Sequence, residues 1–152
     1  MTKGDHMLDR SPTHLLHRAG QCAGEIFHAE MPGELTPRQL AVLVTVAQNE
    51  GLSQTGLVER TGVDRSTLAD IVKRLTKRGL LQRRRTREDA RAYAVKLTEE
   101  GRRVLRVAEP LGKRVDTRVL NAIPSGHREE FMTALRTIVQ TLEGISTQAR
   151  AG

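Results

Sequence analysis

The feature that most constrains this fold is a change in the spacing of apolar residues partway along the chain. Between residues 64 and 79 the apolar side chains recur at helical offsets, as Leu68, Ile71, Val72 and Leu75. Over residues 93–97 apolar and other side chains alternate instead, which is typical of a strand, and residues 80–85 provide a partner strand. The pattern predicts a mainly α fold with one small β-hairpin.

The sequence contains clear signals for where the helices begin and end. Four starts carry a capping side chain, and two of them also place proline at the first helical position: Ser11-Pro12, Thr36-Pro37, Ser53 and Asp64. Thr36 and Gln39 form a capping box, and glycines at 51, 62 and 79 mark helix ends. Thr98 begins a long helix that Pro110 should kink or split, and Ser125 is expected to cap a last helix.

The third and fourth expected helices are joined by a short turn at residues 61–63, and the fourth is basic. Two helices joined in this way form a helix-turn-helix. The hairpin that follows has a polar, basic tip at residues 86–91. A helix-turn-helix followed by a basic hairpin predicts a winged helix-turn-helix lobe over residues 35–97.

Positive charge is concentrated in this lobe. Residues 60–106 contain 15 basic and six acidic side chains, whereas the whole chain carries a net charge of +7. A basic block inside an otherwise near-neutral chain indicates a polyanion site, although a solvated charged surface is the alternative. Aromatic residues make up only 2% of the sequence, which disfavours a single-strand binder that stacks bases on rings.

Other function classes find little support. The sequence has no phosphate-cradling glycine loop, no HExxH and no GxSxG, so we expect no enzyme. One cysteine, Cys22, excludes an internal disulfide and disfavours a thiolate metal site. No apolar run reaches membrane-spanning length and the first ten residues are polar, so we expect a cytoplasmic protein without a cofactor.

From residue 35 to residue 105 the chain resembles the MarR family of bacterial regulators. The motifs that carry the resemblance are Leu35-Thr36-Pro37-Arg38-Gln39, Asp64-Arg65-Ser66-Thr67-Leu68, Leu75 through Gly79-Leu80-Leu81, and Asp89-x-Arg91 followed by Leu97-Thr98-x-x-Gly101. The resemblance implies a two-fold homodimer, with residues 11–30 and 98–148 as dimerisation helices. It also implies a near-palindromic operator and an effector pocket between these helices and the DNA-binding lobe.

The candidate DNA contacts lie off the apolar stripe of the fourth helix, at the start of the third and at the hairpin tip. They are Ser53, Gln54, Arg65, Ser66, Thr67, Asp70, Lys73, Arg74, Arg87, Asp89 and Arg91. Arg65 and Thr67 are assigned to base edges, and Arg87 and Arg91 to phosphates or the minor groove. An acid at Asp70 repels phosphate unless it accepts from a cytosine amino group.

The effector is the least defined partner. Ala69-Asp70 and the run at residues 82–85 are similar to a branch of the family that controls aromatic-acid catabolism, and some of its members sense acyl-CoA thioesters. The function implied is a ligand-responsive repressor released from its operator by a small aromatic acid or its acyl-CoA thioester. The candidate ligand residues are His14, His17, Arg18, Gln21 and Arg38.

Three alternatives stay open. Cys22 is either a buried apolar residue, as its place beside Ala23 favours, or a redox-sensing thiol. His14 and His17 are three residues apart and form a weak metal pair without a third ligand. A non-regulatory architectural DNA-binding module is the third alternative.

Overall fold

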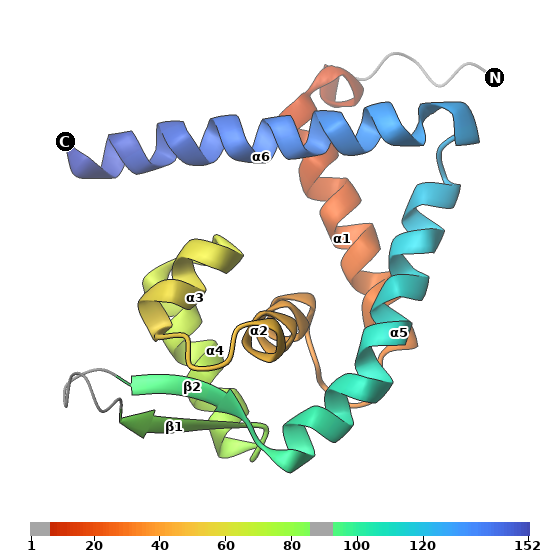
Figure 1. Cartoon of the computed structure of the whole chain (residues 1–152). Coiled ribbons are helices and arrows are strands. Elements are labelled where there is room, and N and C mark those ends of the chain that lie inside the picture. The colour runs from red at the N-terminus through yellow and green to blue at the C-terminus, as the bar shows by residue number, and fades with distance from the viewer. Residues whose placement is uncertain (1–6, 86–92) are drawn as a thin grey trace. The chain divides into compact units, whose positions relative to one another are not determined.

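The computed structural model describes residues 7–85 and 93–152 (Figure 1). The helices are η1 (Met7–Arg10), α1 (Pro12–Glu30), α2 (Pro37–Gln48), α3 (Gln54–Thr61), α4 (Arg65–Lys77), α5 (Glu99–Asn121), η2 (Ser125–His127) and α6 (Arg128–Ala151), and the strands are β1 (Leu81–Arg85) and β2 (Tyr93–Leu97). The order confirms the predicted winged helix-turn-helix between outer helices.

The expected helix starts at Ser11, Thr36 and Ser53 are confirmed by side-chain hydrogen bonds. The Ser11 hydroxyl accepts from the His14 N–H, and Thr36 and Gln39 exchange both bonds of a capping box. Ser53 accepts from the Gly56 N–H at 3.1 Å and begins α3. Gly62 ends α3 with a φ of 67°, a left-handed conformation that glycine adopts without a Cβ clash.

The hairpin is antiparallel, with Leu81 opposite Leu97 and Arg85 opposite Tyr93. The simple alternation expected for residues 93–97 is broken at its first two residues, because Tyr93 is exposed and Ala94 is buried. Ala94 forms a bridge with Ser53, and the Val95 N–H donates to the Leu52 carbonyl at 2.9 Å. The segment before α3 therefore lies along the outer edge of β2, joined to it by this isolated bridge and this hydrogen bond.

The core of the winged helix-turn-helix lobe is built from the apolar stripes. All four predicted α4 residues, Leu68, Ile71, Val72 and Leu75, are buried with side chains from α2, α3, the hairpin and α5. In α2, Val42 and Val46 are buried beside the predicted Leu40 and Leu43, whereas Ala47 is exposed. These four buried α4 residues therefore determine which face of the helix points outward.

The start of α5 is locked to the end of α4. The Thr98 hydroxyl donates to the Gly79 carbonyl at 2.5 Å and accepts from the Gly101 N–H at 2.9 Å, while the Thr98 N–H donates to the Leu80 carbonyl. Thr98 therefore caps α5, as expected, and also closes the hairpin. A Cβ at Gly101 would collide with the Leu80 carbonyl oxygen, so the close approach requires glycine.

The chain divides into two compact units, residues 1–115 and residues 116–152. Helix α5 runs without a break past Pro110, so of the two effects expected of this proline, a kink or a split, the split does not occur. The expected cap at Ser125 is also wrong, because residues 125–127 form a 3₁₀ turn closed by the His127 N–H and the Pro124 carbonyl. Helix α6 begins one turn later, at Arg128, without a side-chain cap.

In the single chain the faces of α1 and α6 are largely exposed. Leu15 and Leu16 on α1, and Ile138, Val139, Leu142 and Ile145 on α6, are all exposed apolar side chains. Cys22 is exposed as well, so the expectation of a buried cysteine does not hold for the isolated chain. None of the helices in the part of the chain that is described is long and apolar enough to cross a membrane.

Candidate functional site

The first turn of α4 is organised by one carboxylate. Asp64 precedes the helix and accepts three hydrogen bonds, from the Thr67 N–H at 3.0 Å, the Ser66 hydroxyl at 2.9 Å and the Thr67 hydroxyl at 2.6 Å. Helix starts favour this arrangement because the N–H groups of the first turn have no partner within the helix. Arg65 and Ser66 are exposed, and Thr67 is half-buried.

These hydrogen bonds determine whether the two hydroxyls can donate to or accept from an outside partner. Both hydroxyl protons are directed at Asp64, so Ser66 and Thr67 offer acceptor lone pairs to an outside partner. In a major groove, acceptors match the amino groups of cytosine and adenine. Arg65 is the complementary donor, and guanine presents two acceptors in that groove.

Asp70 is not an isolated acid on the outward face of α4. Its Oδ2 atom accepts from the Arg74 Nε at 2.8 Å, one helical turn further on. The pair leaves the terminal nitrogens of Arg74 available to an anion and reduces the repulsion that an unpaired carboxylate would exert on phosphate. Lys73 is exposed on the same helix.

The start of α3 lies next to the start of α4. Gln54 and Arg65 line the same small hollow of about 100 Å³, together with Thr55, Val58 and Leu68. Ser53 is occupied by capping α3 and by its bridge to Ala94. The structure therefore brings Gln54 to Arg65 and gives Ser53 a positioning role.

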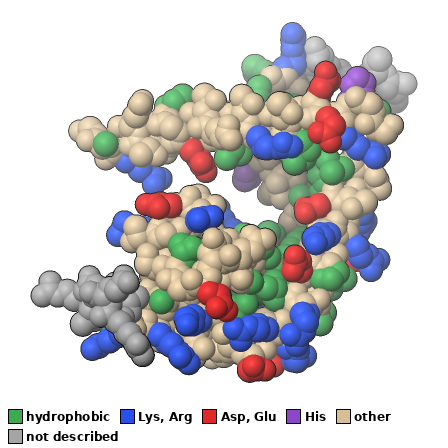
Figure 2. All heavy atoms as spheres, in the orientation of Figure 1, with side chains coloured by type: hydrophobic (Ala, Val, Ile, Leu, Met, Phe, Trp, Pro, Cys, Tyr) green, Lys and Arg blue, Asp and Glu red, His purple; other side chains and the backbone are tan. Residues whose placement is uncertain are grey.

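The hairpin adds a basic edge to the same unit. Arg83, Arg84 and Arg85 are exposed on β1, and Lys and Arg side chains lie along the lower edge of Figure 2, where β1 and the start of α5 lie in Figure 1. The Arg85 guanidinium lies 5.8 Å from the centre of the Tyr93 ring. The candidate residues Arg87, Asp89 and Arg91 lie outside the described residues, and their roles stay predictions.

The candidate effector residues are not gathered in one pocket. His17, Arg18 and Gln21 are exposed on α1, His14 is half-buried and Arg38 is exposed in the first turn of α2. An open pocket of about 570 Å³ lies between the end of α1 and the start of α2, and of the five residues only Gln21 is in its lining. No group of three His, Cys, Asp or Glu side chains suited to a metal occurs within residues 7–85 and 93–152.

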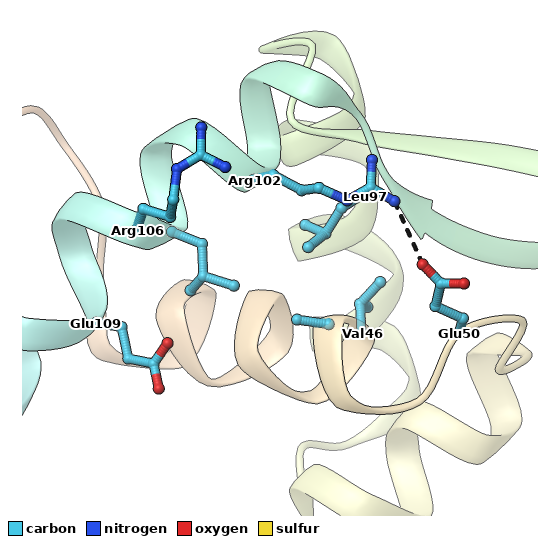
Figure 3. Close-up of a pocket in the computed structure, with 8 residues that line it drawn as sticks. Val46, Glu50, Leu97, Arg102, Arg106 and Glu109 are labelled. Carbon is cyan, nitrogen blue, oxygen red and sulfur yellow. Dashed lines mark hydrogen bonds and ion pairs between the residues drawn. The ribbon is translucent and has the colours of Figure 1, made fainter.

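A second pocket, of about 240 Å³, was missed by the sequence reasoning. It lies between the C-terminal half of α2, the end of β2 and the first turns of α5 (Figure 3). Its lining consists of Val46, Ala47, Glu50, Leu97, Arg102, Leu105, Arg106 and Glu109. These residues come from three elements, and the only local signal was two arginines four residues apart, outside the apolar stripe of α5.

The charged groups of this pocket differ in their pairing. Arg102 Nη2 lies 3.3 Å from Glu50 Oε1, across 52 residues of sequence, and Glu109 pairs with Lys113 at 3.6 Å. Outside the pocket lining, Arg103 donates to Glu100; this hydrogen bond lowers the pKa of the Glu100 carboxyl and raises the pKa of Arg103. Within the described residues no hydrogen bond or ion pair engages Arg106.

Comparisons of sequence place these features in a known family. Residues 34–92 match the MarR family. The transcriptional regulator HosA from Escherichia coli O127:H6 is 36% identical over 112 residues, which are 74% of this chain and 82% of that protein.

Comparisons of structure agree. PcaV, a transcriptional regulator from Streptomyces coelicolor solved with its natural ligand, has a TM-score of 0.83 and 33% identity and covers 88% of this chain and 94% of its own. CouR, a transcriptional repressor bound to a 23-mer DNA duplex, has a TM-score of 0.79 and 30% identity, covering 87% and 94%.

A third solved structure links DNA binding to a small acid. BpsR from Bordetella bronchiseptica, whose DNA binding is regulated by 6-hydroxynicotinic acid, has a TM-score of 0.76 and 27% identity and covers 84% of this chain and 97% of its own. These relatives are named as regulators and not as enzymes. The winged helix-turn-helix, the capped basic α4 and these matches together show that the chain belongs to the MarR family of DNA-binding transcriptional regulators.

Proposed function

We propose that this protein is a homodimeric, sequence-specific repressor that releases near-palindromic double-stranded DNA when it binds a small aromatic acid. The observation that carries the DNA-binding part is the first turn of α4, where the Asp64 cap holds Ser66 and Thr67 beside the exposed Arg65. Four buried α4 residues support this face from behind. A rigid, basic, polar helix face is what direct readout of a major groove needs.

The homodimer is supported by the exposed apolar side chains of α1 and α6. A chain with these side chains in water leaves apolar surface that a second copy can cover. We assign residues 11–30 and 98–148 to this interface. A two-fold dimer requires half-sites about one helical turn apart, roughly 10 bp.

The effector part is supported by the relatives. The DNA binding of BpsR is regulated by 6-hydroxynicotinic acid, which is an aromatic acid, and PcaV was solved with its natural ligand. Repression is the mode named for CouR. An acyl-CoA thioester is the second candidate effector. The candidates for contacting the effector, whichever of the two it is, remain His14, His17, Arg18, Gln21 and Arg38.

The test begins with selection of bound duplexes from a random pool, followed by affinity measurements on the selected and a scrambled duplex across a salt series. The Arg65→Ala substitution should cost about 1–3 kcal/mol on the selected duplex and much less on the scrambled one. The Arg91→Ala substitution should weaken both and flatten the slope of log affinity against log salt by about one unit. Equal losses on both duplexes for both variants would show that the basic block is only an electrostatic surface.

A further inference from the structure

Asp70 and Arg74 form an ion pair on the outward face of α4. The Arg74 Nε donates to Asp70 Oδ2 at 2.8 Å, and the side chains of Arg74 and Asp70 are 69% and 58% exposed. The four buried side chains of α4 lie on the other side of the helix, so both members of the pair point away from the core. An exposed ion pair of this kind contributes little to stability, which leaves its place on this helix face to be explained.

The pairing determines which nitrogens of Arg74 an outside acceptor can use. A guanidinium forms two parallel hydrogen bonds either through Nε and one terminal nitrogen or through both terminal nitrogens. Because Asp70 takes the Nε proton, only the approach through both terminal nitrogens stays open. The carboxylate also holds a long, flexible side chain in one orientation, so part of the entropy cost of ordering it is met before DNA binds.

Charge distinguishes Arg74 from the neighbouring Lys73. The Asp70–Arg74 pair carries no net charge, whereas Lys73 is exposed and no hydrogen bond or ion pair engages it within residues 7–85 and 93–152. Phosphate is bound mainly through net positive charge, which favours Lys73. The major-groove edge of guanine is neutral and presents two acceptors, so it requires well-aimed donors, which the paired Arg74 provides. The two adjacent cations therefore suit different parts of the duplex.

We propose that Arg74 reads one guanine of each half-site, donating from its two terminal nitrogens to O6 and N7, and that Asp70 is the positioning residue that aims it. This inference rests on the proposed function and names a base that α4 selects. It also accounts for an acid on a helix that faces a polyanion, because the Asp70 carboxylate is directed at Arg74. Asp70 itself contacts no base and no phosphate.

The first arm of the experiment changes single atoms of the selected duplex. Each guanine is replaced in turn by 7-deazaguanine, which lacks N7, or by hypoxanthine, which keeps O6 and N7 and lacks only the minor-groove amino group. The wild-type protein should lose affinity about fivefold or more at one 7-deazaguanine of each half-site, and less than about twofold with hypoxanthine there. The Arg74→Ala variant should bind the duplexes with guanine and with 7-deazaguanine at this position equally well, within about twofold, because the donor to N7 is gone.

The second arm tests Asp70. The Asp70→Ala substitution should raise affinity for the scrambled duplex, because a negative charge is removed, and should still lower the preference for guanine about threefold or more, because Arg74 is no longer aimed. Asp70→Asn keeps an oxygen that accepts from the Arg74 Nε and should retain most of the preference. In the Arg74→Ala background, Asp70→Ala should change no base preference, since the two residues act as one unit.

Two variants are matched controls. Lys73→Ala removes the adjacent positive charge; it should weaken binding to the selected and scrambled duplexes alike and flatten the salt slope by about one unit, with the guanine preference intact. Glu59 is an exposed acid of α3 outside the candidate DNA contacts. Glu59→Ala removes the same charge as Asp70→Ala and should leave the guanine preference unchanged. Circular dichroism verifies that each variant is folded.

Four outcomes overturn the proposal. The first is that no guanine N7 matters less to Arg74→Ala than to the wild type. The second is an Arg74→Ala variant that weakens both duplexes equally and flattens the salt slope, which would assign Arg74 to phosphate. The third is an unchanged guanine preference in Asp70→Ala, and the fourth is a base preference that Asp70→Ala alters in the Arg74→Ala background.

Each of these outcomes leaves the proposed function intact as long as the wild-type protein still prefers its selected duplex over the scrambled one. Failure of that preference would instead contradict the proposed function.

Discussion

At the scale of single residues, Asp64 determines which hydrogen bonds α4, the helix proposed to face DNA, can offer to a base. Its carboxylate takes the protons of two neighbouring hydroxyls as well as a backbone N–H. The cap was predictable from the sequence, because Asp before a helix is a common start. The sequence did not predict that Ser66 and Thr67 would present acceptors to an outside partner. This depends on which oxygen atom each hydroxyl donates to in the folded chain.

We expect the Ser66→Ala substitution to relax the base preference at one position of each half-site, where an amino donor of cytosine or adenine is favoured. Loss of one accepted hydrogen bond corresponds to about 0.5–1.5 kcal/mol. Competition among duplexes that differ at single positions measures this change. A preference that shifts equally at every position would contradict the assignment of Ser66 to one base.

The Asp64→Ala substitution should lower the free energy of unfolding by about 1 kcal/mol, because the cap of α4 is lost. Asp64→Asn keeps one side-chain oxygen as acceptor and is the control, with a smaller expected loss. Urea unfolding followed by circular dichroism measures both variants. If the two variants were equally destabilised, the cap would not be the origin of the effect.

At the scale of elements, the joint between the hairpin and α5 depends on two residues, Thr98 and Gly101. Thr98 bonds to both sides of the joint, and Gly101 allows the Leu80 carbonyl to approach the helix. Sequence patterns predicted the helix starts before α6, the α4 stripe and the paired strands, since these depend on local spacing. They failed at Tyr93 and Ala94, because the Ser53 segment that covers β2 is distant in sequence.

The Gly101→Ala substitution should destabilise the protein by about 2–3 kcal/mol, because a backbone carbonyl cannot move aside as a side chain can. Gly112→Ala, in the same helix, is the matched control. Its Cβ would lie 2.8 Å from Leu40 Cδ2, the end of a flexible side chain, and alanine favours helix by about 0.5–1 kcal/mol. Thermal unfolding should therefore show a much larger loss for Gly101→Ala than for Gly112→Ala.

At the scale of the whole molecule, the distribution of apolar surface is uneven. The core of the DNA-binding lobe is closed, whereas α6 has no buried residue in the single chain. The sequence predicted that the outer stripes need a partner, because their spacing is amphipathic. It did not reveal the α2–α5 pocket, whose lining spans residues 46–109 and forms only after three elements pack together.

The Leu142→Glu substitution should shift the protein from dimer to monomer at micromolar concentration, because a charge would be placed on the apolar face of α6. Gln140→Glu adds the same charge two residues away, on the other side of the helix, and should leave the dimer intact. Light scattering after size exclusion measures the mass of each variant. A wild-type protein that is monomeric and still binds its selected duplex tightly would contradict the homodimer.

The hydrogen bond from the Val95 N–H to the Leu52 carbonyl affects how fast the Val95 amide hydrogen exchanges with solvent. It joins the hairpin to the segment before α3, so the Val95 amide is released only when these two parts separate. Deuterium uptake at this amide therefore reports how often the winged helix-turn-helix lobe opens. A slow uptake that accelerates when an effector binds would register the loosening of the lobe before any DNA has left it.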